Sequence, residues 1–251
     1  MKASLVLAFS LLAGAASAAA PTHPSLAGMW DYQGRIDVKQ QIPPPPLTPE
    51  GEKLMARKNA IRQGGFVRNV ANILCLPTGV PQLMQWKSPL EILDSVDRVT
   101  ILTEHDPGND EPRTIYLNKK APAEPDPSWN GYSVGHWQGA TFVVETSGFN
   151  DRGLLLQNVP RSASAKFVER FHLTDGGKTL IDEMTITDPI LTKPWTVGFR
   201  YSRLPLGTER LEAVCEPDLL ALKALDLQSL KETDVEAARL LDPALQYNAG
   251  H

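Results

Sequence analysis

The sequence predicts a mainly β fold, built as an antiparallel β-barrel with an N-terminal helix and a C-terminal helical segment. Residues 73–215 contain short runs of β-branched and aromatic residues, separated by turns rich in glycine and proline. Two hairpins stand out, one around Gly139 and one around residues 175–177. The 251 residues, 42% of them hydrophobic and 22% charged, suit one globular barrel, and the lack of a fixed-period repeat disfavours a solenoid or propeller.

Four segments are expected along the chain. Residues 1–20 have the pattern of a signal peptide, with Lys2 before an apolar run and small residues that place cleavage after Ala18 or Ala20. The run is short for a membrane anchor, so we expect export to the periplasm or beyond and no stable membrane insertion. The other segments are an extended, proline-rich stretch at residues 21–47, the barrel with its leading helix at 48–216, and a leucine-striped helical segment packed on the barrel at 217–251.

The helix is expected to begin after Thr48, whose hydroxyl can cap it, and to end near Ile61. Pro49 suits the first helical position, and Glu50 suits the first turn. A first short strand is expected at residues 28–32. Besides the two hairpins, the remaining strands are expected at residues 91–93, 98–104, 114–117, 195–203 and 209–216.

The first hairpin carries the first functional lead. With a two-residue turn at residues 138–139, His136 faces Thr141 across the strands. Strand alternation places Glu145 on the same face, whereas Trp137 points the other way as a core or rim aromatic. An imidazole beside a hydroxyl, with a carboxylate further along, suits acid–base chemistry or ligand binding.

This stretch also carries a resemblance. Residues 135–146 match the motif Gly-His-Trp-(Glu/Gln)-Gly-(Asp/Ala)-Thr-x-Val-Val-(Asp/Glu)-Thr, although Ala140 stands where Asp is frequent. The chain resembles a large family of secreted bacterial proteins, mostly uncharacterised, over about residues 74 to 215. The resemblance implies a lipocalin-type β-barrel and implies no shared activity. The further matching blocks are Cys75-Leu76-Pro77, Gly79-Val80-Pro81, Val168-Glu169-Arg170-Phe171, Asp188-Pro189 and Pro194-Trp195-Thr196.

The second hairpin places two carboxylates on an apolar face. Residues 166–174 and 178–187 flank Asp175-Gly176-Gly177, which supplies the positive φ of a tight turn. Glu169 and Asp182 then lie among apolar side chains, where burial raises a carboxyl pKa unless donors are found. The opposite face carries Arg170, His172 and Glu183. The expected cross-strand pairs are Leu173 with Leu180, Phe171 with Asp182, and Arg170 with Glu183.

Cys75 and Cys215 are the only cysteines in the sequence. Export to an oxidising compartment favours a disulfide between them, and two buried free thiols are the alternative. Because the closed loop would be long, the loop-closure model assigns the bond roughly 4 to 5 kcal/mol of stability.

Several chemistries lack their motifs in this chain. There is no Gly-x-Ser-x-Gly nucleophile elbow, phosphate-binding glycine loop or dinucleotide fingerprint. A metal site would need long-range assembly from His105, His136 and His172, whose spacing matches no ligand pattern. We therefore expect no cofactor and no metal. A net charge of −4 without a basic cluster disfavours nucleic acid as a partner.

Two functions remain open from the sequence. The first is a periplasmic barrel that binds a small, largely apolar or aromatic molecule in its cavity. The second is a cofactor-independent enzyme for hydration, elimination, isomerisation or hydrolysis of such a molecule. The candidate acid–base residues are His136 with Glu169, Asp182 or Glu183 as its carboxylate partner, and a structural His136 is the alternative. The candidate ligand-binding residues are Trp137, Thr141, Glu145, Arg170 and His172.

Overall fold

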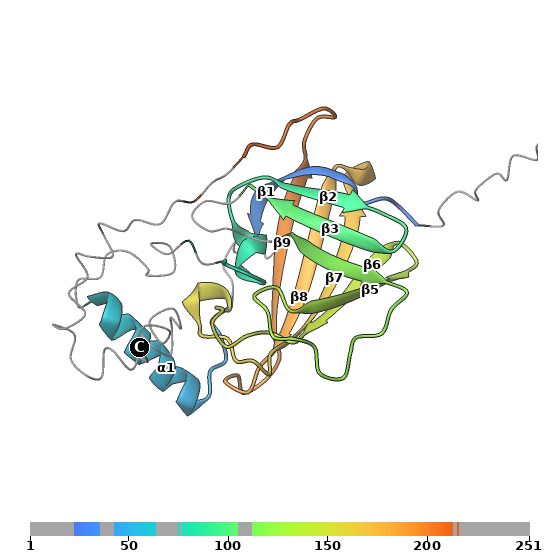
Figure 1. Ribbon diagram of the computed structural model, residues 1–251. Helices are drawn as coiled ribbons and strands as arrows, with labels where there is room; N and C mark the ends of the chain where they lie inside the picture. Colours follow the sequence, from blue (N-terminus) through green and yellow to red (C-terminus); the bar gives the residue numbers. More distant parts are fainter. Residues whose placement is uncertain are drawn as a thin grey trace, which may run out of the picture.

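The structure, a computed structural model, describes residues 23–35, 43–63, 75, 77–104, 112–212 and 215. Within these ranges, nine strands follow one another around a closed barrel (Figure 1). The predicted mainly β fold and its barrel closure are confirmed. The strands are β1 (Gly28–Arg35), β2 (Leu90–Asp94), β3 (Arg98–Thr103), β4 (Arg113–Leu117), β5 (Tyr132–Gln138), β6 (Thr141–Ser147), β7 (Lys166–Thr174), β8 (Thr179–Thr187) and β9 (Trp195–Arg203).

One strand pair runs parallel, which corrects the expectation of an entirely antiparallel barrel. β4 pairs with β5 in parallel, and every other neighbouring pair in the barrel is antiparallel. Strand directions alternate around an antiparallel barrel, so closure with nine strands requires one parallel pair. Residues 118–131 make this change by returning along the barrel before β5 begins. The eight-stranded up-and-down barrel of lipocalins needs no such pair.

The barrel closes between its first and last strands. β9 pairs with β1, from Trp30 opposite Arg203 to Arg35 opposite Phe199, with a shift in register after Tyr32. The barrel therefore includes a strand from the segment at residues 21–47, whereas the sequence placed its start at residue 48. Closure also leaves β9 no free edge for the strand expected at residues 209–216. The described residues 209–212 form no strand there.

The hairpin of β7 and β8 has the predicted register. Leu173 pairs with Leu180, Phe171 with Asp182, and Arg170 with Glu183. The alternation of buried and exposed residues places Glu169 and Asp182 inside the barrel, as predicted. The turn holds Gly176 and Gly177, both with positive φ.

The hairpin of β5 and β6 differs from the predicted register. Gln138 pairs with Thr141 and His136 pairs with Val143, so the turn consists of Gly139 and Ala140. Gly139 has a φ of +62° and takes the first turn position, where a type II′ turn requires positive φ. The predicted turn placed Gly139 second. Because the displacement amounts to one residue on each strand, the assignment of side chains to the two faces is unchanged.

The apolar side chains of alternate strand positions form one buried cluster inside the barrel. Trp30 and Phe142 are fully buried there, and the Trp30 indole Nε1 donates to the carbonyl of Leu26 at 2.9 Å. The inner-facing members of the cluster are Trp30, Leu90, Ile92, Val99, Ile101, Ile115, Phe142, Val144, Phe167, Phe171, Leu180, Met184, Ile186, Trp195, Val197, Phe199 and Tyr201.

Helix α1 (Pro49–Gln63) follows Thr48, whose Oγ1 accepts a hydrogen bond from the Gly51 amide at 3.1 Å. The Thr48 amide donates to the carbonyl of Ile190 at 2.8 Å, which ties the start of the helix to the loop after β8. Within the described part of the chain, no helix has both the length and the apolar character needed to span a membrane. The predicted signal peptide, the predicted C-terminal helical segment and His105 lie outside the described residues.

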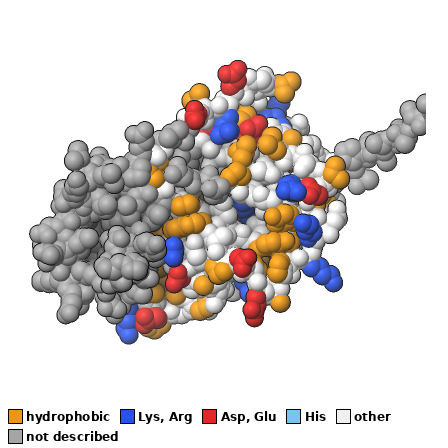
Figure 2. Space-filling view, in the orientation of Figure 1, with side chains coloured by type: hydrophobic (Ala, Val, Ile, Leu, Met, Phe, Trp, Pro, Cys, Tyr) orange, Lys and Arg blue, Asp and Glu red, His pale blue; other side chains and the backbone are white. Residues whose placement is uncertain are grey.

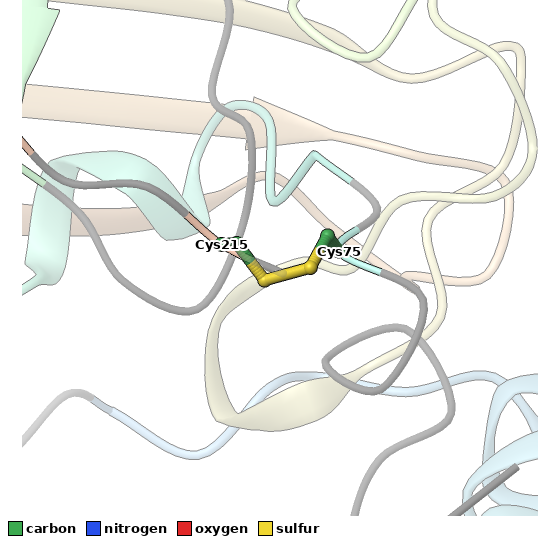
Figure 3. The surroundings of a disulfide bond; sticks show 2 residues. All are labelled: Cys75 and Cys215. Atoms are coloured by element: carbon green, nitrogen blue, oxygen red, sulfur yellow. A yellow bond between two sulfur atoms is a disulfide. The ribbon is translucent and has the colours of Figure 1, made fainter. Parts of the chain in front are cut away.

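Cys75 and Cys215 form the predicted disulfide (Figure 3). Their Cα atoms lie 5.7 Å apart, and the bond joins positions 140 residues apart in the sequence. Cys75 is buried and precedes a short 3-10 helix, η1 (Gln82–Gln85). Two other 3-10 turns are η2 (Leu156–Asn158) and η3 (Asp175–Gly177).

Candidate functional site

An ion pair lies inside the barrel. Arg113 on β4 extends to Glu169 on β7, and both side chains are at most 1% exposed. The pair is bidentate: Arg113 Nη1 donates to Glu169 Oε1 at 2.8 Å, and Nη2 donates to Oε2. Burial lowers the pKa of Arg113, but the Glu169 carboxylate more than offsets this, so the pKa is raised overall. The guanidinium is therefore charged.

Two hydroxyls complete the environment of Arg113. Nη2 also donates to Thr146 Oγ1 on β6 at 3.3 Å, and Thr146 Oγ1 lies 2.8 Å from Ser133 Oγ on β5. All three side chains are buried. Consecutive strands β4 to β7 thus contribute to one polar network inside an apolar interior. A fully hydrogen-bonded network of this kind rigidifies its surroundings, whereas an unpaired member is costly.

Asp182 on β8 is the unpaired member. Its side chain is fully buried, and neither carboxyl oxygen has a hydrogen-bond partner. Burial raises the pKa of Asp182 well above its ordinary value, and the nearby Glu169 carboxylate raises it further against the opposing effect of Arg113. The raised pKa favours the neutral form of this carboxyl group, which can donate a hydrogen bond. The Nε of Arg113 is likewise buried without a partner.

Tyr201 on β9 adds a phenol to the same environment. Its hydroxyl donates to the backbone carbonyl of Met84 in η1, so this donor is already in use. Burial raises the pKa of Tyr201 well above its ordinary value, and the Asp182 carboxyl group raises it further. We call Arg113, Glu169 and Asp182, with Thr146, Ser133 and Tyr201 around them, the interior polar cluster.

A second buried cation, Arg161, serves the loops rather than this cluster. It donates to the backbone carbonyls of Val80 and Trp129, the latter at 3.1 Å, and to Asn150 Oδ1 at 3.2 Å. Burial lowers its pKa to about 9. Because its partners are mainly backbone carbonyls of separate loops, we assign Arg161 the role of holding those loops together.

His136 lies on the outside of the barrel. It is exposed, and its Nε2 lies 2.9 Å from the amide nitrogen of Gln138. Glu169 and Asp182 point into the barrel from other strands, so the sheet separates them from His136. The structure therefore does not bring His136 together with either inward carboxylate. The reason is the period of two in a strand, which sends these side chains to opposite faces.

The other sequence-predicted residues divide between the two faces. Arg170 and Glu183 are paired and exposed on the outside, and Arg170 lies 3.4 Å from the Gln138 amide oxygen. Thr141 and Glu145 also face outward from β6, as does His172 from β7. Trp137 is half-buried, packs against the core and stacks on the ring of His23, with ring centroids 4.0 Å apart.

The outer surface contrasts with the interior. On the face shown in Figure 2, acidic and basic side chains are intermingled with apolar ones. Arg98 contacts Asp97 at 2.7 Å in an exposed ion pair, which contributes little to stability because water screens it. Among the described residues, no group of three or more His, Cys, Asp and Glu side chains is arranged to hold a metal ion. We therefore take the interior polar cluster, rather than the outer surface, as the candidate site.

The sequence interpretation missed Arg113 and Tyr201. A signal for Arg113 was present, because it alternates with Ile115 and Leu117 on one face of β4. Two carboxylates expected on an apolar face require a cation from another inward position. Arg113 is a cation at an inward position of this kind, and it lies directly before the strand expected at residues 114–117.

No model of a protein family matches this chain, and no curated protein matches its sequence. The assignment of the site therefore depends on the geometry and burial of its own side chains.

Replacing Asp182 with Asn is expected to stabilise the protein increasingly as the pH rises. Because the folded-state pKa of Asp182 is raised, the folded protein holds this proton more tightly than the unfolded chain does. Stability from this group is complete below the unfolded-state pKa of about 3.9 and is lost as the pH rises through the folded-state pKa. Thermal unfolding of both proteins from about pH 4 to about pH 8 measures the difference.

Asp97→Asn is the matched control for this measurement. A hydrogen bond from Arg98 lowers the pKa of the exposed Asp97 carboxylate. The sign is therefore opposite: any contribution of Asp97 is present at neutral pH and is lost as the pH falls. A difference in melting temperature between Asp182→Asn and the wild type that stays constant with pH would contradict a neutral Asp182.

Proposed function

We propose that the protein binds a small, largely apolar molecule inside its barrel and that the interior polar cluster contacts a polar group of that molecule. One observation supports this most. Both carboxyl oxygens of Asp182 and the Nε of Arg113 are buried without hydrogen-bond partners. Buried polar atoms of this kind each cost about 1–3 kcal/mol when unsatisfied, so a ligand that pairs with them gains that energy.

The apolar part of the ligand follows from the surroundings. Asp182 has Phe171 and Phe199 opposite it on the neighbouring strands, and Leu180 and Met184 flank it on β8. These side chains are buried members of the core cluster. A molecule that reaches Asp182 therefore contacts mainly aromatic and aliphatic groups, as ligand sites in small barrels do.

One end of the barrel suits the approach of such a molecule. Leu117, Trp137 and Leu173 point inward at the ends of β4, β5 and β7, and each is only partly buried. Most other inward apolar side chains are almost completely buried. We therefore place the entrance at this end, beneath the stacked rings of His23 and Trp137.

A second candidate function is acid–base catalysis on the bound molecule. Asp182 supports it, because burial and the Glu169 carboxylate raise its pKa and hold a neutral acid in an apolar site. In this candidate, Asp182 replaces His136 as the acid, since His136 lies outside the barrel. The predicted export signal and the resemblance to a family of secreted bacterial proteins add a periplasmic or extracellular location to the proposal.

The experiment is a thermal-shift screen of terpenoid, steroid and aromatic compounds, followed by methyl NMR with the hits. Hits should raise the melting temperature and shift the methyl signals of Ile101 and Ile115, which point into the barrel. Ile181 is the internal control, because it lies beside Asp182 in sequence but faces outward. Hits that shift Ile181 and leave Ile101 and Ile115 unchanged, or a screen without hits, would contradict interior binding.

A further inference from the structure

The unpaired atoms of the interior polar cluster are not equally divided between donors and acceptors. Arg113 Nε is a donor, and the neutral carboxyl group of Asp182 contains one O–H donor and one carbonyl acceptor. Both oxygens of Glu169 and Thr146 Oγ1 already accept hydrogen bonds from Arg113. Among the buried atoms of the cluster that have no hydrogen-bond partner, donors thus outnumber acceptors.

We propose that the polar group recognised inside the barrel is a carbonyl oxygen on an apolar body, as in a ketone, an aldehyde or an enone, and that it accepts hydrogen bonds from Asp182 and Arg113 Nε. The inference rests on the proposed function, because it names the chemistry of the ligand for that site. A carbonyl oxygen has two lone pairs and no donor, so it can satisfy both unused donors at once. It also brings no charge into the apolar interior.

Other head groups fit the cluster less well. A hydrocarbon leaves both donors unsatisfied. An alcohol oxygen can also accept from both donors, but its own O–H then needs an acceptor, and the unused acceptor among these atoms belongs to the same Asp182 carboxyl group that donates to it. An ammonium group adds further donors and requires Asp182 to give up its proton in an apolar environment. A carboxylate places a second anionic group beside Glu169, with Arg113 as the cluster's single cation. The expected order of affinity is ketone, then alcohol, then hydrocarbon and amine.

The test uses four molecules with one body and different head groups: cyclohexyl phenyl ketone, the corresponding secondary alcohol, the corresponding amine, and cyclohexylphenylmethane. Their dissociation constants are measured by calorimetry or by competition against a hit from the thermal-shift screen. The ketone should bind at least about tenfold more tightly than the hydrocarbon, which corresponds to pairing one or two buried donors. In infrared spectra, the stretch of an isotopically labelled carbonyl should lie at lower frequency in the bound ketone than in the same ketone dissolved in a hydrocarbon.

Variants of Asp182 locate the effect. Asp182→Leu removes the donor at similar volume, so the preference for the ketone over the hydrocarbon should fall about tenfold and the infrared shift should shrink. Asp182→Asn keeps an N–H donor and should retain much of the preference. Glu183→Gln is the matched control, because Glu183 is the next residue of β8 and faces outward, and it should bind all four molecules as the wild type does.

The outcomes separate the two proposals. If all four molecules bind with equal affinity and shift the Ile101 and Ile115 signals, the barrel binds apolar molecules but the carbonyl inference is wrong. If the amine binds most tightly, Asp182 acts as a counter-ion and the inference is also wrong. If none of the four binds, while other hits occupy the interior, the inference fails alone. If nothing at all binds inside the barrel, the proposed function fails and the inference with it.

Discussion

Replacing Arg113 with Met is expected to lower the free energy of unfolding by about 3–5 kcal/mol at neutral pH, because the change removes the only cation of the interior polar cluster. The Glu169 carboxylate then remains buried beside Asp182 without a compensating charge. For a domain of this size the loss corresponds to a fall in melting temperature of about 6–20 °C. Calorimetry or circular dichroism during thermal unfolding measures it.

Two further measurements test the electrostatic cause. The loss of stability in Arg113→Met should become smaller at low pH, because an uncharged carboxyl group needs no cation. The double variant Arg113→Met with Glu169→Leu should recover most of the lost stability, since a buried ion pair can often be replaced by apolar residues without cost. If the single and double variants are equally unstable at every pH, the loss reflects packing and the ion pair is not its origin.

Removing the disulfide between Cys75 and Cys215 is the second large effect. The bond joins positions 140 residues apart, so it restricts the unfolded chain over most of the described structure. In the loop-closure model, the double variant Cys75→Ala with Cys215→Ala loses about 4–5 kcal/mol of stability, or about 8–20 °C in melting temperature. Strand content should persist, because the barrel closes through β1 and β9 and not through this bond.

The control for this prediction is chemical reduction. A reductant should lower the melting temperature of the wild type to that of the double variant and should leave the double variant unchanged. Mass analysis after alkylation of unreduced protein from its native compartment provides an independent check. Recovery of two alkylated cysteines there would show that the bond is not formed.

The parts of the fold that local patterns encode could be predicted from the sequence. The glycine-containing turn at residues 175–177 and the alternation on either side define the register of β7 and β8, including the inward positions of Glu169 and Asp182. The cap at Thr48 defines the start of α1. The cysteine pair could be inferred because the sequence contains two cysteines and a pattern that predicts export.

The features that depend on contacts between distant strands could not be predicted in this way. The pairing of β1 with β9 leaves β9 no free edge, so the described residues 209–212 form no strand there, and no local pattern in residues 209–216 reports it. Likewise, Glu169 meets Arg113 only because β4 and β7 lie on the same closed barrel. The sequence made His136 a candidate because imidazole is a common acid–base group. Whether its side chain points into the barrel depends on which face of β5 is buried, and the local sequence does not determine this.

The turn at Gly139 shows a smaller limit. Both Gln138-Gly139 and Gly139-Ala140 are possible two-residue turns, and the choice depends on which position requires positive φ. In the structure, Gly139 occupies the first of the two turn positions. A displacement of this kind conserves the faces of both strands, so the prediction that His136 shares a face with Thr141 and Glu145 is unaffected by it.

The parallel pairing of β4 with β5 has a consequence for the order of folding. It divides the barrel into two antiparallel meanders, β1 to β4 and β5 to β9; within the second, each strand pairs with its neighbour in sequence. Contacts local in sequence form with little loss of chain entropy, so the second meander is expected to assemble early, with the β1–β9 closure late. Glu169 and Asp182 belong to the early meander, whereas Arg113 arrives with β4 across the parallel pair. Arg113 therefore reaches these two carboxyl groups only while the barrel is being completed. Partly assembled forms leave the carboxyl groups without their cation, and this makes such forms less stable than the closed barrel.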